Sequence, residues 1–277
     1  MNKVGIVYHP LNHKAGVLAG ELEAFLRSKG VACWLSSAWE GDEVSGNVED
    51  SDLVLTIGGD GTILRAAQAI APRQVPITGI NLGRLGFMTE LAADEAIHRL
   101  PSLLAGEGWL DERAMLAAEV SATGAEPGEK KRFLALNDVV VARGEVARII
   151  DVEASIDGRP ATVYKADGVI AASATGSTGY SLSAGGPVLN PQAADYLLVP
   201  ILPYLSLRYP LVIPAESVVE LKVGSIYRAV LSIDGHLSLP LDGGSSIVIR
   251  HSPVKTRFLR IGPRDSFYAT LERKLKG

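Results

Sequence analysis

Residues 53–70 place a glycine-rich turn between a strand pattern and a helix pattern, and this order constrains the fold most. Leu53–Ile57 is a short apolar run, partly β-branched, which is typical of a buried strand. Gly58-Gly59-Asp60-Gly61-Thr62 follows, and residues 63–70 have a helical pattern. Asp60 is therefore expected at the carboxyl end of a strand, which is where open α/β sheets bind ligands.

The composition of this turn indicates a particular chemistry. Its glycines have no Cβ atoms, so the backbone can approach a phosphate and direct N–H groups at it. An anion would also lie near the positive end of the following helix. A carboxylate repels phosphate, so Asp60 needs a hydroxyl or a metal-bound group as its counterpart. These features indicate phosphoryl transfer to an alcohol, and the alternative is a tight turn in which Asp60 caps the helix.

Two familiar phosphate-binding motifs are weakened as explanations of this turn. No Lys-Ser or Lys-Thr pair follows the glycines, as a Walker loop would require. Leu64 occupies the position of the last glycine in the Gly-x-Gly-x-x-Gly dinucleotide fingerprint.

Composition limits the class of protein. The chain has 277 residues, of which 47% are hydrophobic, enough for one large or two ordinary domains. A formal net charge of −4 argues against a broad nucleic-acid surface. Cys33 is the only cysteine, which excludes an intramolecular disulfide. The N-terminal apolar run is too short for a signal peptide, and residues 196–205 are too short to span a membrane. We expect a soluble cytoplasmic protein with no nucleic-acid or membrane partner.

The pattern of strands and helices changes near residue 113. Before it, strand patterns at 4–8, 31–35, 53–57 and 75–80 alternate with helical patterns at 15–28, 63–70 and 94–104, the last with Asp94 as a possible cap. This alternation predicts a parallel sheet covered on both faces. After it, strand patterns follow one another at 115–120, 133–141, 149–156, 218–223, 228–233 and 247–250, and residues 121–131 form a polar loop pattern. We expect an α/β nucleotide-binding domain over 1–112 and an antiparallel β domain over 113–259, with a helix within 260–277 that packs on the first domain.

Two further segments carry polar residues where strands end or break. Asn81-Leu82-Gly83-Arg84-Leu85-Gly86-Phe87 follows the fourth strand, so Asn81 shares a sheet edge with Asp60 if the two strands are adjacent. The alternative is a glycine-rich strand exit with Phe87 in the core. Asn137-Asp138 interrupts the apolar pattern at 133–141, which indicates an edge or bulge, or an amide and a carboxylate that hydrogen-bond a sugar.

Residues 173–187 consist largely of small hydroxyl residues and glycines. Such a stretch makes a poor core, and it lacks the charge of a solvated linker. Its hydroxyls and N–H groups can surround a ribose, an adenine edge or a phosphate. The alternative is a long loop without a ligand.

Taken in order, these segments resemble the NAD kinases over nearly the whole chain. The match comprises Gly58-Gly59-Asp60-Gly61-Thr62, Asn81-x-Gly83-x-Leu85-Gly86-Phe87, Asn137-Asp138, Asp167-Gly168, residues 175–187 and Asp234-Gly235. Diacylglycerol, sphingosine and phosphofructo-kinases carry a first motif like this one, so the segment 175–187 makes the resemblance specific.

The resemblance implies transfer of the terminal phosphate of ATP, or of polyphosphate, to the 2′-hydroxyl of the adenosine ribose of NAD. It implies a Rossmann-like α/β domain, a C-terminal β-sandwich, a site between them, and a homodimer or homotetramer with some site residues facing a neighbouring subunit. Asp60 would be the base, and Mg²⁺ would arrive with ATP, since the sequence shows no metal cage. The other dinucleotide-binding residues carried over are Gly61, Asn137, Asp138, Arg148, Lys165, Asp167, Thr175, Thr178, Gly179, Tyr180, Ser181, Leu182, Ser183 and His236.

Within that set, Asn137 and Asp138 would hold the adenosine half of NAD. Lys165 and Asp167 would lie toward the nicotinamide half, on one face if a single strand carries both, and they lead us to expect a preference for NAD over NADH. Arg148 and His236 would lie at its edges.

The chain departs from the family pattern at several positions. Asp138 replaces the usual Glu, Gly179 the usual Ala, and His236 the usual Gln, while residues 203–207 replace a common Pro-His-Ser-Leu-Ser segment. These changes affect specificity more than reaction class. Two other functions stay open: a lipid or sugar kinase with the same glycine turn, and a dinucleotide-binding sensor without catalysis.

Overall fold

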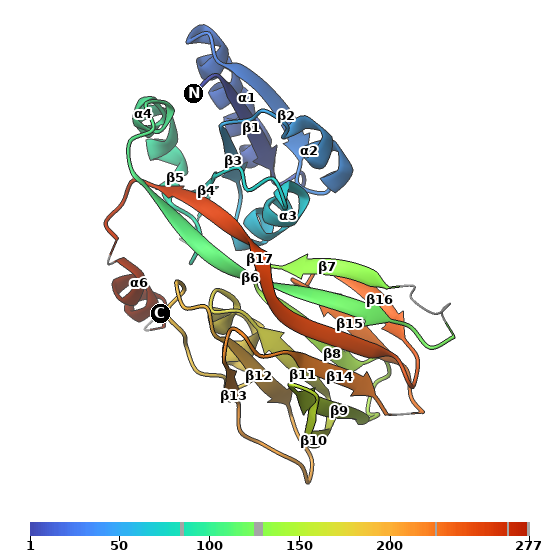
Figure 1. Cartoon of the computed structure of the whole chain (residues 1–277). Coiled ribbons are helices and arrows are strands. Elements are labelled where there is room, and N and C mark those ends of the chain that lie inside the picture. The colour runs from blue at the N-terminus through green and yellow to red at the C-terminus, as the bar shows by residue number, and fades with distance from the viewer. Residues whose placement is uncertain (84–85, 125–129, 225, 265, 276–277) are drawn as a thin grey trace. The chain divides into compact units, whose positions relative to one another are not determined.

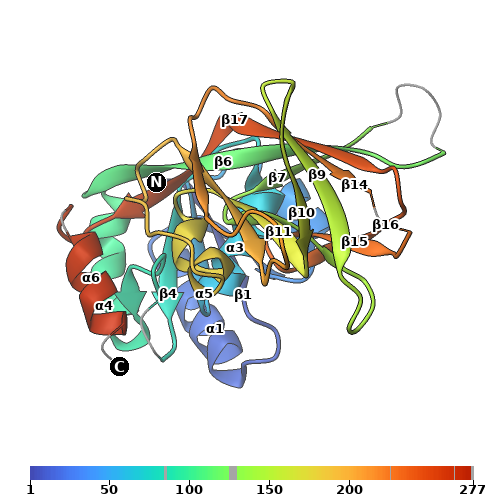
Figure 2. The ribbon, with the colours of Figure 1, turned by 90° about the horizontal axis from the view of Figure 1, so that it is seen from below.

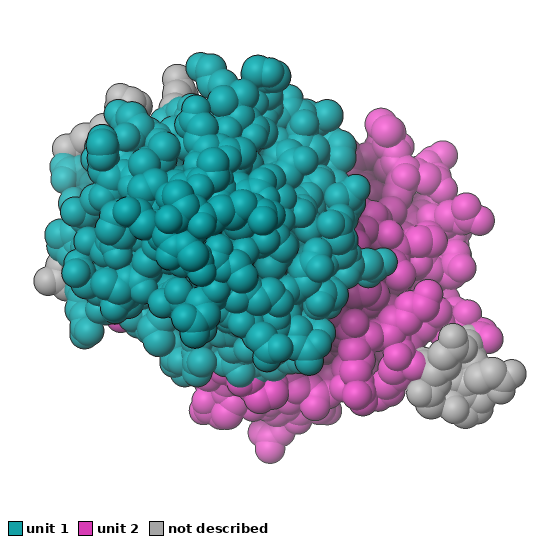
Figure 3. All heavy atoms as spheres, turned by 90° about the horizontal axis from the view of Figure 1, so that it is seen from above, with its two compact units in different colours: residues 1–113, 254–277 teal, residues 114–253 magenta. Residues whose placement is uncertain are grey.

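The computed structural model describes residues 1–83, 86–124, 130–224, 226–264 and 266–275 (Figure 1). The chain forms two compact units, unit 1 with residues 1–113 and 254–277, and unit 2 with residues 114–253 (Figure 3). The sequence placed the corresponding boundaries after residues 112 and 259. In the described part of the chain, no helix is both long and apolar enough to cross a membrane.

Unit 1 is an α/β domain built on a parallel sheet. Its strands are β1 (Lys3–Tyr8), β2 (Ala32–Ser37), β3 (Leu53–Ile57), β4 (Ile77–Asn81), β5 (Leu91–Ala92) and the end of β17 (Ser246–Arg260). They are arranged in the order β17-β4-β3-β1-β2, with β5 paired to β4, and these pairings are parallel. The carboxyl ends of β1, β3 and β4 therefore meet at one edge, and the adjacency of β3 and β4 on which the shared edge of Asp60 and Asn81 depended is present.

Helices cover both faces of this sheet. They are α1 (His13–Ser28), α2 (Gly41–Asn47), α3 (Asp60–Ile70) and α4 (Ala93–Leu104). A further helix of unit 1, α6 (Ser266–Leu275), follows β17. α1 and α4 share a hydrophobic core with β1, β3 and Ile80 of β4. Ile63 of α3 packs instead beside Gly79. Because Gly79 and Ile80 are adjacent in β4, they face opposite sides of the sheet, so α3 covers the other face. This arrangement confirms the predicted α/β class.

Unit 2 is rich in antiparallel β structure. Its strands are most of β6 (Trp109–Ser121), β7 (Lys131–Ala135), β8 (Asp138–Arg143), β9 (Ile150–Ile156), β10 (Arg159–Ala166), β11 (Gly168–Ala172), β12 (Tyr196–Ile201), β13 (Leu211–Ile213), β14 (Val219–Val223), β15 (Ala229–Ile233), β16 (Leu237–Leu241) and the first part of β17. One sheet has the order β13-β12-β11-β8-β15-β16 and another contains β10-β9-β14-β17, with β6 paired to β17 and β7. Two short helices follow β11, a 3₁₀ turn at Gly176–Thr178 and α5 (Tyr180–Ser183).

The two sheets of unit 2 share one hydrophobic core. Val152 of β9 and Leu221 of β14 belong to the same buried cluster as Val141 of β8 and Val169 of β11. β9 and β10 form a hairpin (Figure 2) whose turn, Asp157-Gly158, has φ angles of 52° and 73°. The predicted turn at this position is confirmed, because consecutive positive φ values are those of a two-residue hairpin.

The single strand predicted at 133–141 is wrong. The chain forms two strands there, and they belong to different sheets: β7 pairs with β6, whereas β8 pairs with β11 and β15. The polar pair Asn137-Asp138 marks the crossing point. A hydrophobic pattern continues through such a crossing because both strands line the same core.

Smaller predictions at element ends also need correction. α4 begins after Ala92, which makes no side-chain capping bond, so Asp94 is not its N-cap. α2 was not predicted, because residues 41–47 contain two glycines and one buried apolar residue, Val44. Within the predicted polar loop at 121–131, residues 125–129, including Pro127 and Gly128, lie outside the described residues.

Candidate functional site

Asp60 lies in the first turn of α3, but its carboxylate is directed at a different segment. The N-cap of α3 is Gly59, which has no side-chain capping bond. The two carboxylate oxygens of Asp60 accept hydrogen bonds from the backbone N–H of Phe87 at 2.8 Å and of Met88 at 3.1 Å. Asp60 therefore does not cap its own helix. It is held in a fixed orientation by the segment that follows β4.

Gly86 makes this orientation possible. A Cβ atom at Gly86 would overlap the carboxylate of Asp60. The N–H of Gly86 donates to the Thr89 hydroxyl at 2.8 Å, which fixes the turn around it. Of the sequence pattern at 81–87, Arg84 and Leu85 lie outside the described residues.

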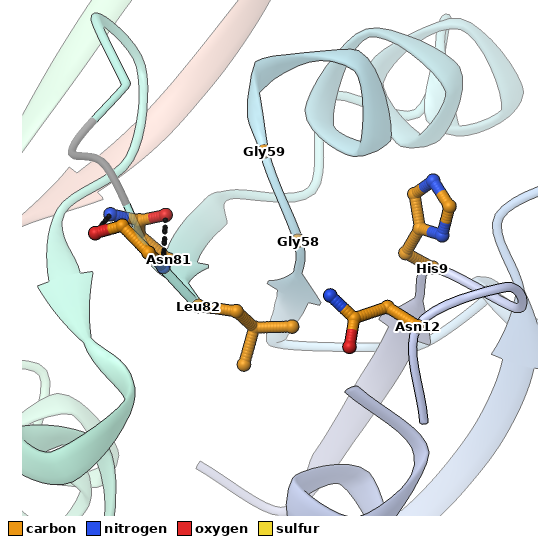
Figure 4. A pocket seen from close by; sticks show the side chains of 7 residues that line it. His9, Asn12, Gly58, Gly59, Asn81 and Leu82 are labelled. Atoms are coloured by element: carbon orange, nitrogen blue, oxygen red, sulfur yellow. Dashed lines mark hydrogen bonds between the residues drawn. The ribbon is translucent and has the colours of Figure 1, made fainter. Parts of the chain in front are cut away.

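A cavity of about 250 Å³ lies beside the glycine turn (Figure 4). Its lining comes from the carboxyl ends of three parallel strands and consists of His9, Asn12, Gly58, Gly59, Asn81, Leu82 and Gly83. Asn81 is bonded to Gly83 through both its oxygen and its nitrogen, so its amide fixes the start of the 81–88 segment. The short polar side chains and the glycines that line this cavity suit a phosphate group.

His9 and Asn12 were not predicted as site residues. They follow β1, and Asn12 also caps α1 by accepting the N–H of Lys14 at 3.0 Å. Figure 4 shows the amide nitrogen of Asn12 on the side of Gly58. A lone His and a lone Asn form no recognisable spacing. They could have been found from their position directly after the first strand, because the carboxyl end of that strand lies at the same sheet edge as Asp60.

The described residues show no side-chain metal site. Within those ranges, no group of three or more His, Cys, Asp or Glu side chains could hold a metal ion. Asp60 uses both of its oxygens on backbone N–H groups.

Asp234 organises the second group of predicted residues, which lies in unit 2. Its carboxylate accepts the backbone N–H groups of Leu136 at 2.9 Å, Asn137 at 2.7 Å and Asp138 at 3.0 Å. This side chain is buried, and its φ of 49° places it in the left-handed region. The three bonds hold the chain at the crossing between β7 and β8. The motif Asp234-Gly235 was recognised in the sequence, but this role of Asp234 was not.

Asp138 is the second buried carboxyl group at this place. Burial raises its pKa to about 7, with a further contribution from the charge of Asp234. Burial also raises the pKa of Asp234, to about 6, against the lowering effect of its three N–H bonds. The charge of Asp234 disfavours the ionised form of Asp138. A ligand hydroxyl or amino group that donates a hydrogen bond would stabilise that ionised form.

We expect this pair to make folding stability depend on pH. The pKa of Asp138 is higher in the folded than in the unfolded chain. Its contribution to the free energy of unfolding is therefore fully present below pH 3.8 and is lost as pH rises through about 7. The full shift corresponds to on the order of 4 kcal/mol. Urea unfolding followed by circular dichroism between pH 5 and 8 should show stability falling with pH, and Asp138→Asn should flatten that slope.

Glu220 of β14 offers a matched control, because it is an exposed carboxylate in the same unit. Glu220→Gln should keep the wild-type pH dependence. An Asp138→Asn slope identical to that of the wild type over pH 5–8 would contradict the assignment of this linkage to Asp138.

Asn137 meets the glycine-rich segment directly. Its carbonyl oxygen accepts the N–H of Ser173 at 2.8 Å, and a Cβ at Gly176 would overlap that same carbonyl. The side-chain oxygen of Asn137 is buried and has no hydrogen-bond partner within the described structure. A buried amide oxygen of this kind is available to a ligand donor. Thr175, also buried, lies on the same segment.

The rest of the segment shows its side chains in different environments. The Thr178 hydroxyl donates to the Thr175 carbonyl at 3.2 Å, and Gly179 lies beside the Asn137 amide. Tyr180 is exposed, whereas Ser181 is fully buried where a Cβ at Gly186 would overlap its hydroxyl. Leu182 is half-buried and Ser183 is exposed. The Ser181 hydroxyl therefore packs inward.

Lys165, Asp167 and Arg148 lie away from Asn137. β8 and β11 are antiparallel, so Ala172 pairs with Asp138 at one end and Gly168 pairs with Ala142 at the other. Asp167 precedes Gly168 and forms an ion pair with Arg143 at 3.1 Å. Along β11, Asp167 and Ser173 are about 20 Å apart at about 3.3 Å per residue. Arg148, in the loop after β8, lies over the Tyr227 ring at 5.2 Å.

The expectation that Lys165 and Asp167 share one strand face is wrong. Lys165 belongs to β10 and Asp167 lies between β10 and β11, which are in different sheets. The chain crosses between sheets at Asp167, as it does at Asn137. His236 remains with the Asp234 group: its Nδ1 lies 3.2 Å from the Asp234 carbonyl oxygen.

Comparison with known families covers most of both units. Residues 39–108 match the family model described as ATP-NAD kinase N-terminal domain, and residues 136–261 match the ATP-NAD kinase C-terminal domain. A NAD kinase of Dehalococcoides mccartyi is 49% identical over 275 residues, covering 99% of this chain and 96% of that protein. A NAD kinase of Chloroflexus aggregans is 36% identical over 276 residues, covering 100% and 99% of the two chains.

Solved structures give the same result. Yeast NADH kinase complexed with NADH has a TM-score of 0.87 at 26% identity, covering 100% of this chain and 88% of that one. A NAD kinase from Archaeoglobus fulgidus in complex with ATP has a TM-score of 0.78 at 28% identity, covering 99% and 98% of the two chains. With its fold, its ordered motifs and these full-length relatives, the chain belongs to the NAD kinase family, phosphotransferases that make NADP from NAD and ATP.

Proposed function

We propose that this chain transfers the terminal phosphate of ATP to the 2′-hydroxyl of the adenosine ribose of NAD, with Asp60 as the general base. A ribose hydroxyl is a weak nucleophile, and a positioned carboxylate orients it and accepts its proton as the new bond forms. The two hydrogen bonds from the N–H groups of Phe87 and Met88 hold the Asp60 carboxylate in a fixed orientation at the sheet edge. This fixed carboxylate beside a glycine turn is the observation that carries the proposal.

The ribose oxygen attacks the terminal phosphorus, and the bond from that phosphorus to the bridging oxygen breaks. The bonding electrons leave with ADP, and the hydroxyl proton goes to Asp60. The backbone N–H groups of Gly59, Asp60 and Gly61, at the start of α3, and Mg²⁺ carried by ATP would offset the charge on the phosphates. Gly61, in the first turn of α3, lies beside the dinucleotide in this proposal.

The residues around Asp234 would bind the adenosine half of NAD. The buried oxygen of Asn137, which has no partner in the described structure, can accept a hydrogen bond from the ligand. Asp138 can accept or donate one according to its protonation, since its pKa of about 7 leaves both forms accessible. Thr175, Thr178, Gly179, Tyr180, Leu182 and Ser183 would line the dinucleotide, His236 would lie at its edge, and Ser181 would support the segment from beneath.

Three further properties belong to this proposal: the architecture of the β-rich domain, the phosphate donor and the location in the cell. The β-rich domain is proposed to be a β-sandwich, since its two sheets share one core. The phosphate donor is ATP, with polyphosphate as a second donor to be tested. The single cysteine supports a reducing, cytoplasmic location.

The direct test incubates the purified chain with NAD or NADH and Mg-ATP or Mg-polyphosphate, followed by chromatography. We expect NADP to form with Mg-ATP, with a higher kcat/KM for NAD than for NADH. Tight NAD binding without any turnover would instead support a dinucleotide sensor. NADH as the better acceptor would overturn the proposed preference while leaving the reaction class intact.

We also propose that the site is completed by a neighbouring subunit in a homodimer or homotetramer. Lys165, Asp167 and Arg148 lie at the end of β8 and β11 remote from Asn137, so a second copy could supply them. Lys165 is bonded through its backbone to Tyr204 and Ser206. The segment around these residues exposes four large apolar side chains, Leu202, Tyr204, Leu205 and Tyr209. Such a group suits an interface.

If the neighbour contributes to the site, specific activity should fall on dilution as the subunits separate. Initial rates measured over a wide range of chain concentration, with light scattering on the same samples, would reveal this. Lys165→Ala should lower activity without lowering the subunit count. Activity per chain that stays constant through dissociation would contradict the proposal.

A further inference from the structure

The C-terminal helix α6 brings a lysine to the segment that holds Asp60. The ammonium of Lys274 lies over the Phe87 ring, 3.9 Å from its centroid. A cation at this distance from an aromatic face is attracted by the ring quadrupole. Phe87 is the same residue whose N–H donates to Asp60 at 2.8 Å. Lys274 and the Asp60 carboxylate therefore both contact Phe87, one through its ring and the other through its backbone N–H.

Lys274 interacts electrostatically with Asp60 at this place. Partial burial lowers the pKa of Lys274, and the charge of Asp60 offsets part of that lowering. A lysine in the last turn of a helix would ordinarily extend its ammonium into water. Here the side chain is half-buried instead, with its ammonium over the ring of the residue whose N–H donates to Asp60.

The chemistry proposed above has a use for such a cation. Charge spreads over the oxygens of a phosphoryl group in transfer, and a positive group placed next to them stabilises the transition state. The glycine turn supplies N–H groups but lacks the lysine that follows the glycines in a Walker loop. A fixed ammonium from elsewhere in the chain would take that place.

We propose that Lys274 is a further catalytic residue, whose ammonium contacts the oxygens of the phosphoryl group during its transfer to NAD. This rests on the proposed phosphotransferase function of Asp60. α6 thereby does more than pack on unit 1: it carries a charge to the reaction centre. The alternative is that Lys274 serves as an anchor that holds α6 on Phe87.

Three variants separate these roles. Lys274→Met removes the charge but keeps the length of the side chain and an apolar contact with Phe87. Lys274→Arg keeps the charge. Arg273→Met is the matched control, because it removes one positive charge from the neighbouring, exposed position in the same turn of α6.

Steady-state rates with NAD and Mg-ATP, NAD binding by calorimetry and thermal unfolding are measured for each. We expect Lys274→Met to lower kcat by about 10²-fold, in the range seen when one charge-stabilising group is removed. NAD affinity and Tm should stay near wild type, Lys274→Arg should recover most of the rate, and Arg273→Met should turn over normally.

Two results with active wild-type enzyme would overturn the proposal. One is wild-type turnover by Lys274→Met. The other is a rate loss in Lys274→Met that comes with a lower Tm and is not recovered by Lys274→Arg, which is the signature of an anchor. A wild-type chain that makes no NADP would overturn the phosphotransferase function itself, and the role of Lys274 with it.

Discussion

Replacing Asp60 by Asn is expected to lower kcat by about 10²–10⁴-fold, the usual contribution of a general base. This corresponds to ~3–5 kcal/mol of activation free energy. The loss should appear in kcat rather than in KM, because the proton is accepted only as the transition state forms. Steady-state kinetics at saturating NAD and Mg-ATP, with NAD binding measured separately, would show it.

The structure makes a control for this variant necessary. Asn can still accept one of the two N–H bonds from Phe87 and Met88, but its NH₂ group cannot accept the other, so the 86–88 segment loses about 1 kcal/mol of support. Asp52, just before β3, also accepts two backbone N–H bonds, from Asn2 and Lys3, but both reach the same carboxylate oxygen. Asp52→Asn can keep both bonds through its amide oxygen, so it removes a carboxylate charge at the opposite end of β3 from Asp60, and it should turn over normally. Equal rates for the two Asn variants would contradict a catalytic Asp60.

Gly86→Ala should be nearly as damaging, although the change adds a single methyl group. The new Cβ would overlap the Asp60 carboxylate, so either the carboxylate or the segment must move. A displacement of about 1 Å can cost about 10²-fold in rate. We expect a kcat loss of about that size, measured in the same assay as Asp60→Asn.

Gly20→Ala in α1 is the matched control for Gly86→Ala. A Cβ at Gly20 meets no atom within 4 Å, and alanine favours a helix. This variant should be at least as stable as the wild type and fully active. Normal turnover by Gly86→Ala would show that the carboxylate does not depend on close approach to that glycine.

The sequence identified the parts of the fold that local pattern determines. The strand, glycine turn and helix around Asp60 follow from short-range periodicity and turn chemistry, and so does the Asp157-Gly158 hairpin. The shared edge of Asp60 and Asn81 was expected only if β3 and β4 were adjacent, and the structure pairs these two strands.

Other features depend on partners far away in the chain, which periodicity does not record. The apolar run at 133–141 looks continuous because β7 and β8 line one core from two sheets. Its break is imposed by Asp234, almost a hundred residues later. The hold on Asp60 by Phe87 and Met88, and the return of Lys274 to Phe87, are long-range contacts of the same kind.

The central claim is the identity of the phosphate acceptor. A competition assay tests it most directly: the purified chain receives Mg-ATP labelled in its terminal phosphate together with NAD, diacylglycerol in vesicles and fructose 6-phosphate. We predict that label passes to NADP, and that Asp60→Asn suppresses this transfer while still binding NAD. Label that passes to the lipid or the sugar in preference to NAD, or NAD binding with no labelled product at all, would contradict the account.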